Sequence, residues 1–157
     1  MMARLGGAFM IAVASFLVSF DIIDREKRRI ECVDGFLLLV SHIREQIECY
    51  STPIKTILEE CDPYVLKKLG LSDQAPDFGQ MITESERMLT EDSLKALRRF
   101  SSTLGKSYRE VQIRECNKAI AVLEGQRGML KAAYPSKRKT VIAMGAAVGG
   151  MAVILLV

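Results

Sequence analysis

Two long runs without a charged residue stand near the two ends of the chain, and almost all of the charge lies between them. The first run covers residues 5–20 and the second covers residues 141–157. A helix needs about 17–25 apolar residues to cross a hydrocarbon core of ~30 Å, and a helix satisfies its own backbone hydrogen bonds in lipid. We therefore predict membrane-spanning helices at 1–23 and 141–157, with a separate domain at 24–140.

The charges beside the two runs predict their orientation. Basic residues follow the first run and precede the second: Arg25, Lys27, Arg28, Arg29, Lys131, Lys137, Arg138 and Lys139. The positive-inside rule then places residues 24–140 in the cytoplasm and both ends of the chain outside. The whole chain carries a net charge of +3, which is too small to indicate a nucleic-acid-binding protein.

An alternative interpretation of the first run is a cleaved signal peptide. Arg4 would be its basic start, and Ala12–Ala14 resembles an A-x-A cleavage site. Cleavage there would release a secreted helical protein. The apolar run continues past this site to Phe20 and is followed by Arg25–Arg29, which favours a retained anchor.

The pattern of the middle domain is helical throughout. Apolar residues recur every three or four positions in 30–50 and again in 107–134, whereas no segment alternates with period two. Helix starts are predicted at Thr52–Pro53, Asp62–Pro63 and Thr90, and helix ends at Gly70 and Gly105. Pro135 predicts a kink or a break before the second run. We predict an all-α fold: a bundle of about five to six helices flanked by two single membrane-spanning helices.

A marked joint separates two predicted helices at Phe100–Gln112. Gly105 suits a left-handed residue after the first helix. Ser107 and Glu110 match the S-x-x-E capping box that starts a helix. Gly105 and Ser107 are therefore predicted to form a structural hinge.

The sequence shows no motif that carries catalysis. It contains no P-loop, no G-x-S-x-G and no H-E-x-x-H. The single histidine, His42, and the four cysteines do not have the spacing of a zinc site. We predict no enzymatic activity, cofactor or metal. The alternative is a small membrane-anchored sensor or enzyme that uses His42 and the cysteines, which are Cys32, Cys49, Cys61 and Cys116.

The second apolar run contains a G-x-x-x-G pattern. Gly145 and Gly149 form it, and Gly150 follows directly. Small residues at this spacing let another helix approach closely in a membrane. We predict that helices pack through these three glycines.

Several motifs, in order along the chain, resemble one known family. They are the joint at Phe100–Glu110, the opening Leu5–Ala8, the basic segment Arg25–Arg29, and the stretches Ile43–Ile47 and Tyr50–Ile54. In this combination the chain resembles the stage III sporulation protein AB family of endospore-forming bacteria.

This resemblance implies a non-enzymatic platform protein. It would lie on the mother-cell side, in the outer forespore membrane, with most of the protein in the cytoplasm. It would belong to the secretion-like channel between mother cell and forespore. Its helical domain would be similar to the cytoplasmic domains of type II secretion platform proteins. The expected partners are a secretion-type ATPase similar to stage III sporulation protein AA, other membrane components of the channel, and further copies of the chain. Charged residues at the joint are the candidate docking surface: Lys106, Arg109, Glu110 and Arg114.

Overall fold

The protein is an all-α chain, as the sequence predicts. The computed structural model describes residues 2–50, 53–71 and 77–156. These residues form six α-helices and one short 3-10 helix, η1, and none of them lies in a strand. The chain divides into two compact units: residues 1–27 with 131–157 form unit 1, and residues 28–130 form unit 2.

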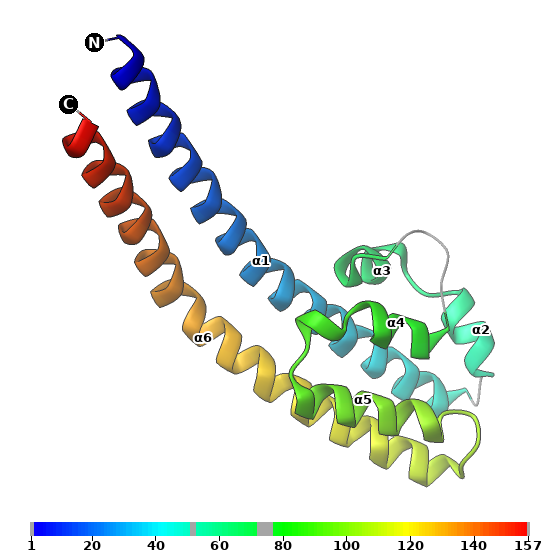
Figure 1. Ribbon diagram of the computed structural model, residues 1–157. Coiled ribbons are helices and arrows are strands. Elements are labelled where there is room, and N and C mark those ends of the chain that lie inside the picture. The colour runs from blue at the N-terminus through cyan, green and yellow to red at the C-terminus, as the bar shows by residue number, and fades with distance from the viewer. Residues whose placement is uncertain (1, 51–52, 72–76, 157) are drawn as a thin grey trace. The chain divides into compact units, whose positions relative to one another are not determined.

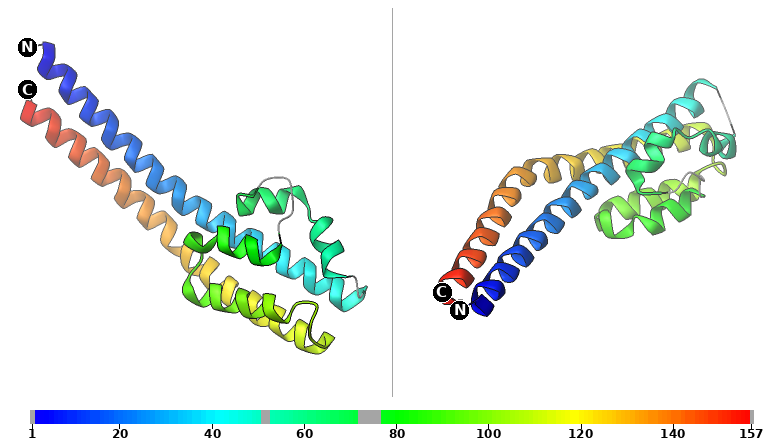
Figure 2. Two further views of the ribbon diagram at one scale, coloured as in Figure 1. Left: turned by 45° about the vertical axis from the view of Figure 1, so that its right-hand side comes forward. Right: turned by 90° about the horizontal axis from the view of Figure 1, so that it is seen from above.

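Unit 1 consists of the outer parts of the two longest helices. Helix α1 spans Met2–Cys49 and helix α6 spans Arg109–Leu156. Their outer parts run side by side in opposite directions (Figure 1 and Figure 2). Within the part of the chain that the structure describes, no helix has a stretch both long and apolar enough to cross a membrane. The predicted segments 1–23 and 141–157 are thus confirmed as helical but not supported as membrane spans, and their residues 1 and 157 lie outside the described ones.

Helix α6 does not break at Pro135. The helix continues through this residue to Leu156, so a break there is wrong, and the kink that was the other possibility stays a prediction. A proline inside a helix removes one backbone hydrogen bond. Here that loss is local, because helix extends for many residues on both sides of Pro135.

Unit 2 contains the inner parts of α1 and α6 and all the short helices. These are α2 (Ile54–Glu59), α3 (Pro63–Leu69), α4 (Phe78–Glu84), η1 (Glu86–Met88) and α5 (Glu91–Thr103). The predicted caps are confirmed for α3, where Asp62 accepts from the Tyr64 N–H at 2.8 Å, and for α5, where the Thr90 side chain accepts from the Ser93 N–H at 3.4 Å. At α2 the N-cap is Pro53, and the predicted cap Thr52 lies outside the described residues.

Three phenylalanines join the helices of unit 2 in the core. Phe36 on α1 and Phe78 on α4 meet edge to face, with ring centroids 6.4 Å apart. Phe78 and Phe100 on α5 meet in the same way at 5.3 Å. All three side chains are buried, so this chain of rings holds α4 between α1 and α5.

The glycine inside α1 marks a close approach of two helices. A Cβ atom at Gly35 would lie 3.1 Å from the Leu69 side chain of α3. Glycine costs a helix up to ~1 kcal/mol relative to alanine. The close contact with α3 explains why the sequence has a glycine there.

Candidate functional site

The joint between α5 and α6 has the left-handed turn that the sequence predicts. Helix α5 ends at Thr103, and Gly105 has a φ of +70°. Side chains with a Cβ rarely adopt this conformation, which is why glycine is suited to the position. Helix α6, however, begins at Arg109 and not at Ser107.

Gln112, and not the predicted capping box, closes the joint. Its side-chain amide donates to the Ser107 carbonyl at 2.6 Å, and its side-chain oxygen accepts from the Gly105 N–H at 3.2 Å. Among the described residues no hydrogen bond joins Ser107 to Glu110. The Ser107 N–H, which the capping box would have used, donates to the Thr103 carbonyl at 3.2 Å instead.

Arg109, a predicted docking residue, is engaged within the protein itself. Its guanidinium donates to the Ile47 carbonyl at 3.1 Å and also to the Glu48 carbonyl. These carbonyls belong to the last turn of α1, where a cation is favoured by the helix dipole. Arg109 thus fastens the start of α6 to the inner end of α1.

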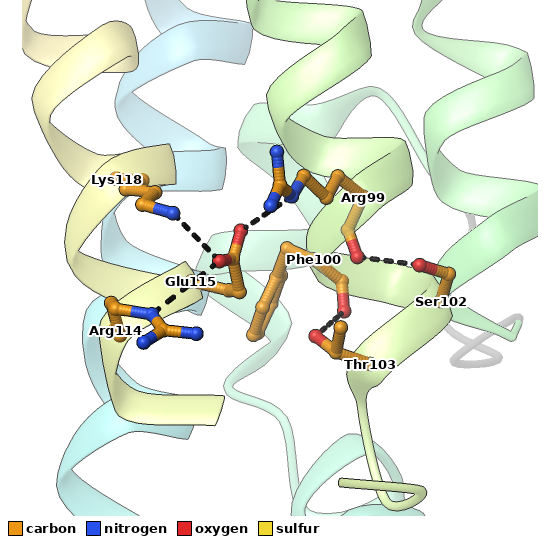
Figure 3. A network of polar contacts seen from close by, with 7 residues as sticks. All are labelled: Arg99, Phe100, Ser102, Thr103, Arg114, Glu115 and Lys118. Atoms are coloured by element: carbon orange, nitrogen blue, oxygen red, sulfur yellow. Dashed lines mark hydrogen bonds and ion pairs between the residues drawn. The ribbon is translucent and has the colours of Figure 1, made fainter. Parts of the chain in front are cut away.

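A buried carboxylate collects three cations where α5 and α6 meet (Figure 3). Glu115 accepts from Lys118 Nζ at 2.8 Å and lies 3.0 Å from Arg99 Nε and 3.8 Å from Arg114 Nε. The Glu115 side chain is 4% exposed, whereas the three cationic side chains are 51–67% exposed. We call these four residues the Glu115 cluster.

The Glu115 cluster carries more positive than negative charge. The hydrogen bond from Lys118 and the positive charges of Arg99, Lys118 and Arg114 lower the pKa of the Glu115 carboxyl, against the effect of desolvation. The carboxylate is therefore ionised at neutral pH, and the four groups together carry a net charge of +2. Glu115 is buried and the three cationic side chains around it are exposed, so they form a basic surface on α5 and α6.

The remaining predicted docking residues are solvent-exposed. Lys106 lies in the joint, and Glu110 and Arg114 lie in the first turns of α6. A groove of about 450 Å³ also lies at the joint, with apolar walls from Ile47 and Ile54. Further lining residues are Pro53, Lys55, Gly105, Arg109 and Gln112.

A second polar centre, which the sequence analysis missed, fixes the start of α5 against α6. Gln126 is buried, and its amide nitrogen donates to the Met88 carbonyl at 3.3 Å. Its side-chain oxygen accepts from Ser93 Oγ at 2.5 Å and from the hydroxyl and N–H of Thr90. In the sequence, the only sign of this centre is a glutamine in a segment whose apolar residues recur with helical spacing.

The cysteines are mostly buried. Burial raises the pKa of the Cys32 thiol to about 11 and that of Cys116 to about 12, so both are protonated at neutral pH. Cys49 is the exposed one. No group of three or more His, Cys, Asp and Glu side chains that could hold a metal ion is found among the described residues.

The three glycines predicted to pack helices lie in different surroundings within unit 1. Gly145 lines a hollow between α1 and α6. Gly149 is half-buried, and Gly150 is exposed, with open space where a side chain would be. Their role in helix packing stays a prediction.

One comparison with known proteins gives a match. A family model described as stage III sporulation protein AB matches residues 78–157. Comparisons with curated proteins and with solved structures give none. The matched region covers half of the chain, from the start of α4 through the joint and the Glu115 cluster to the end of α6. On that match, which includes the joint on which the resemblance chiefly rested, the chain belongs to the stage III sporulation protein AB family.

Proposed function

We propose that this protein is a non-enzymatic, membrane-associated platform of the sporulation channel, which docks a secretion-type ATPase in the cytoplasm of the mother cell. The ATPase would be similar to stage III sporulation protein AA and would perform the ATP hydrolysis. Family membership supports the role in sporulation. The docking of the ATPase is supported by the charges on unit 2.

The net positive charge of the Glu115 cluster is the observation that carries the docking proposal. Three exposed cations share one buried carboxylate, so two positive charges are left to pair with an incoming surface. The hydrogen bond of Lys118 and the ion pairs of Arg99 and Arg114 with Glu115 already restrict these side chains, which lowers the entropy lost on binding. Such a surface fits an acidic segment of the ATPase, because complementary charge speeds association and selects the partner.

The groove at the joint adds an apolar contact to this surface. Ile47 and Ile54 form its walls, and Arg109 is held beside it by its bonds to the end of α1. Binding energy at interfaces is concentrated in a few anchors that fill such hollows. The ATPase segment is therefore expected to be acidic and to carry an apolar side chain.

Unit 1 supports the membrane-associated part of the proposal. Its helices expose many large apolar side chains, among them Met10, Leu17, Val18, Phe20, Met144, Met151 and Ile154. An exposed apolar surface of this kind marks a contact with membrane or protein. Unit 1 would hold the platform at the membrane and leave unit 2 free to receive the ATPase.

Co-purification of the full chain with the candidate ATPase tests the proposal. The double variant Lys106→Gln/Arg114→Gln removes two exposed charges and leaves Arg99 and Lys118 on Glu115. We expect it to recover much less ATPase than the wild type does. The matched control is Lys67→Gln, an exposed lysine on α3, which should recover the wild-type amount. Equal recovery by all three proteins would contradict docking through this surface.

A further inference from the structure

Two hollows in unit 1 are neighbours along the pair of helices, and we call the two together the groove. They share Ile22 of α1 and Val141 of α6, and their volumes are about 360 and 440 Å³. One hollow, here called the polar end, is lined by Glu26, Tyr134, Ser136, Lys137, Arg138 and Thr140. The other, the apolar end, is lined by Ala14, Val18, Val141, Met144, Gly145 and Val148. The groove therefore changes from charged to apolar along its length.

Two small residues, Ala14 of α1 and Gly145 of α6, line the apolar end. Ala14 and Gly145 leave space that larger side chains would fill. Val18, Met144 and Val148 on its walls are more than half exposed. Removing such apolar surface from water is favourable, so this end favours an apolar occupant.

The polar end favours an anion. Lys137 Nζ lies 3.0 Å from Glu26 Oε1, while Arg138 is exposed, and no ion pair of Arg138 occurs among the described residues. Ser136 and Thr140 line the same hollow, where the Thr140 hydroxyl donates to the Ser136 carbonyl at 3.1 Å. The charged side chains that line this hollow are Glu26, Lys137 and Arg138, which leaves it a net charge of +1.

We propose that this groove binds one anionic phospholipid, with its phosphate at Lys137 and Arg138 and an acyl chain along the apolar end. The lengths agree: twelve residues of helix from Glu26 to Ala14 span roughly 18 Å, and the acyl chains of one leaflet span about 15 Å. The basic side chains at the polar end supply the positive charge with which an anionic headgroup pairs. This site is separate from the ATPase surface and stands on the geometry of unit 1 alone.

Native mass spectrometry of the full-length protein in detergent tests the site. The protein is mixed with equal amounts of phosphatidylglycerol and phosphatidylcholine that carry the same acyl chains. We expect the wild type to retain phosphatidylglycerol at least about fivefold over phosphatidylcholine, which is ~1 kcal/mol of preference. Lys137→Gln/Arg138→Gln should abolish the preference. Gly145→Leu, which fills the apolar end, should reduce the binding of both lipids.

The control variant is Lys139→Gln, because Lys139 follows directly in the sequence but does not line the groove. It should keep the wild-type preference. Equal retention of both lipids by the wild type, or an equal loss in Lys139→Gln, would overturn the site. A lipid-free dimer in the mass spectrum would indicate that a second copy of the chain fills the groove, and this would also overturn the lipid site. If Gly145→Leu does not fold, as judged by its circular dichroism, the two charge variants still decide the question. Failure of ATPase binding would leave these outcomes unchanged.

Discussion

Replacing Glu115 with glutamine should destabilise the protein at neutral pH. Glutamine keeps the shape of the side chain but removes the charge that holds Arg99, Arg114 and Lys118. The cations are more than half exposed and can return to water, so each pair is worth only about 0.3–1 kcal/mol. Two of the contacts are short, at 2.8 and 3.0 Å, and the carboxylate is buried, so we expect a total loss of about 1–2 kcal/mol.

Thermal unfolding of the full chain measures this loss. For a protein of this size, 1 kcal/mol lowers the Tm by about 2–4 °C, so Glu115→Gln should unfold roughly 2–8 °C below the wild type. The control is Glu110→Gln, which removes an exposed carboxylate in the first turn of the same helix. Its stability should stay within about 0.5 kcal/mol of the wild type.

The pH dependence of the difference separates the charge from packing. The folded pKa of Glu115 lies below the unfolded value of 4.5, so its contribution is fully present above pH 4.5. The contribution is lost as the pH falls through the folded pKa. The gap between wild type and Glu115→Gln should therefore narrow below pH 4.5. A Tm equal to that of the wild type at neutral pH, or a gap of constant size down to acid pH, would refute the reasoning.

Three further predictions test other parts of the fold. Gly105→Ala should lower the free energy of unfolding by about 1 kcal/mol, because the φ of Gly105 is +70°. Gly125→Ala, in open space within α6, should raise it by up to about 1 kcal/mol. Denaturant unfolding that gives both variants a change of the same sign would contradict this. Gln126→Leu leaves buried donors at the start of α5 without an acceptor and should cost about 1–3 kcal/mol by the same measurement, so an unchanged midpoint would count against this polar centre. Iodoacetamide should label the exposed Cys49 in the native protein. It should label Cys116 only after unfolding, because Cys116 is buried and burial raises the pKa of its thiol to about 12. Mass spectrometry that finds both cysteines labelled equally fast in the native protein would show that Cys116 is not buried.

The helices, most of their starts and the turn at Gly105 could be predicted because their signals are local. Asp62 and Thr90 cap the helices that follow them in the sequence, and Gly70 and Gly105 adopt the left-handed conformation after a helix. Such features depend on residues a few positions apart, which a sequence displays directly. The capping box of Ser107 was also a local signal, but α6 begins two residues later, at Arg109, and the Ser107 N–H donates to the Thr103 carbonyl.

The contacts that build the candidate site could not be predicted, because each depends on packing between distant segments. Arg109 bonds to carbonyls about sixty positions earlier in the chain. Arg127, which interrupts an apolar stripe, lies 2.5 Å from Asp34 on α1. Glu115 resembles any exposed helical carboxylate in the sequence, and only the packing of α5 on α6 shows that it is buried.

Binding of the purified ATPase to the full chain in lipid nanodiscs tests the docking claim most directly. We expect that the affinity falls as salt is raised and that Lys106→Gln/Arg114→Gln binds about tenfold more weakly, a loss of ~1.4 kcal/mol. Lys67→Gln should bind as the wild type does. An affinity that neither salt nor the double substitution changes would show that the ATPase does not dock on the basic surface of α5 and α6.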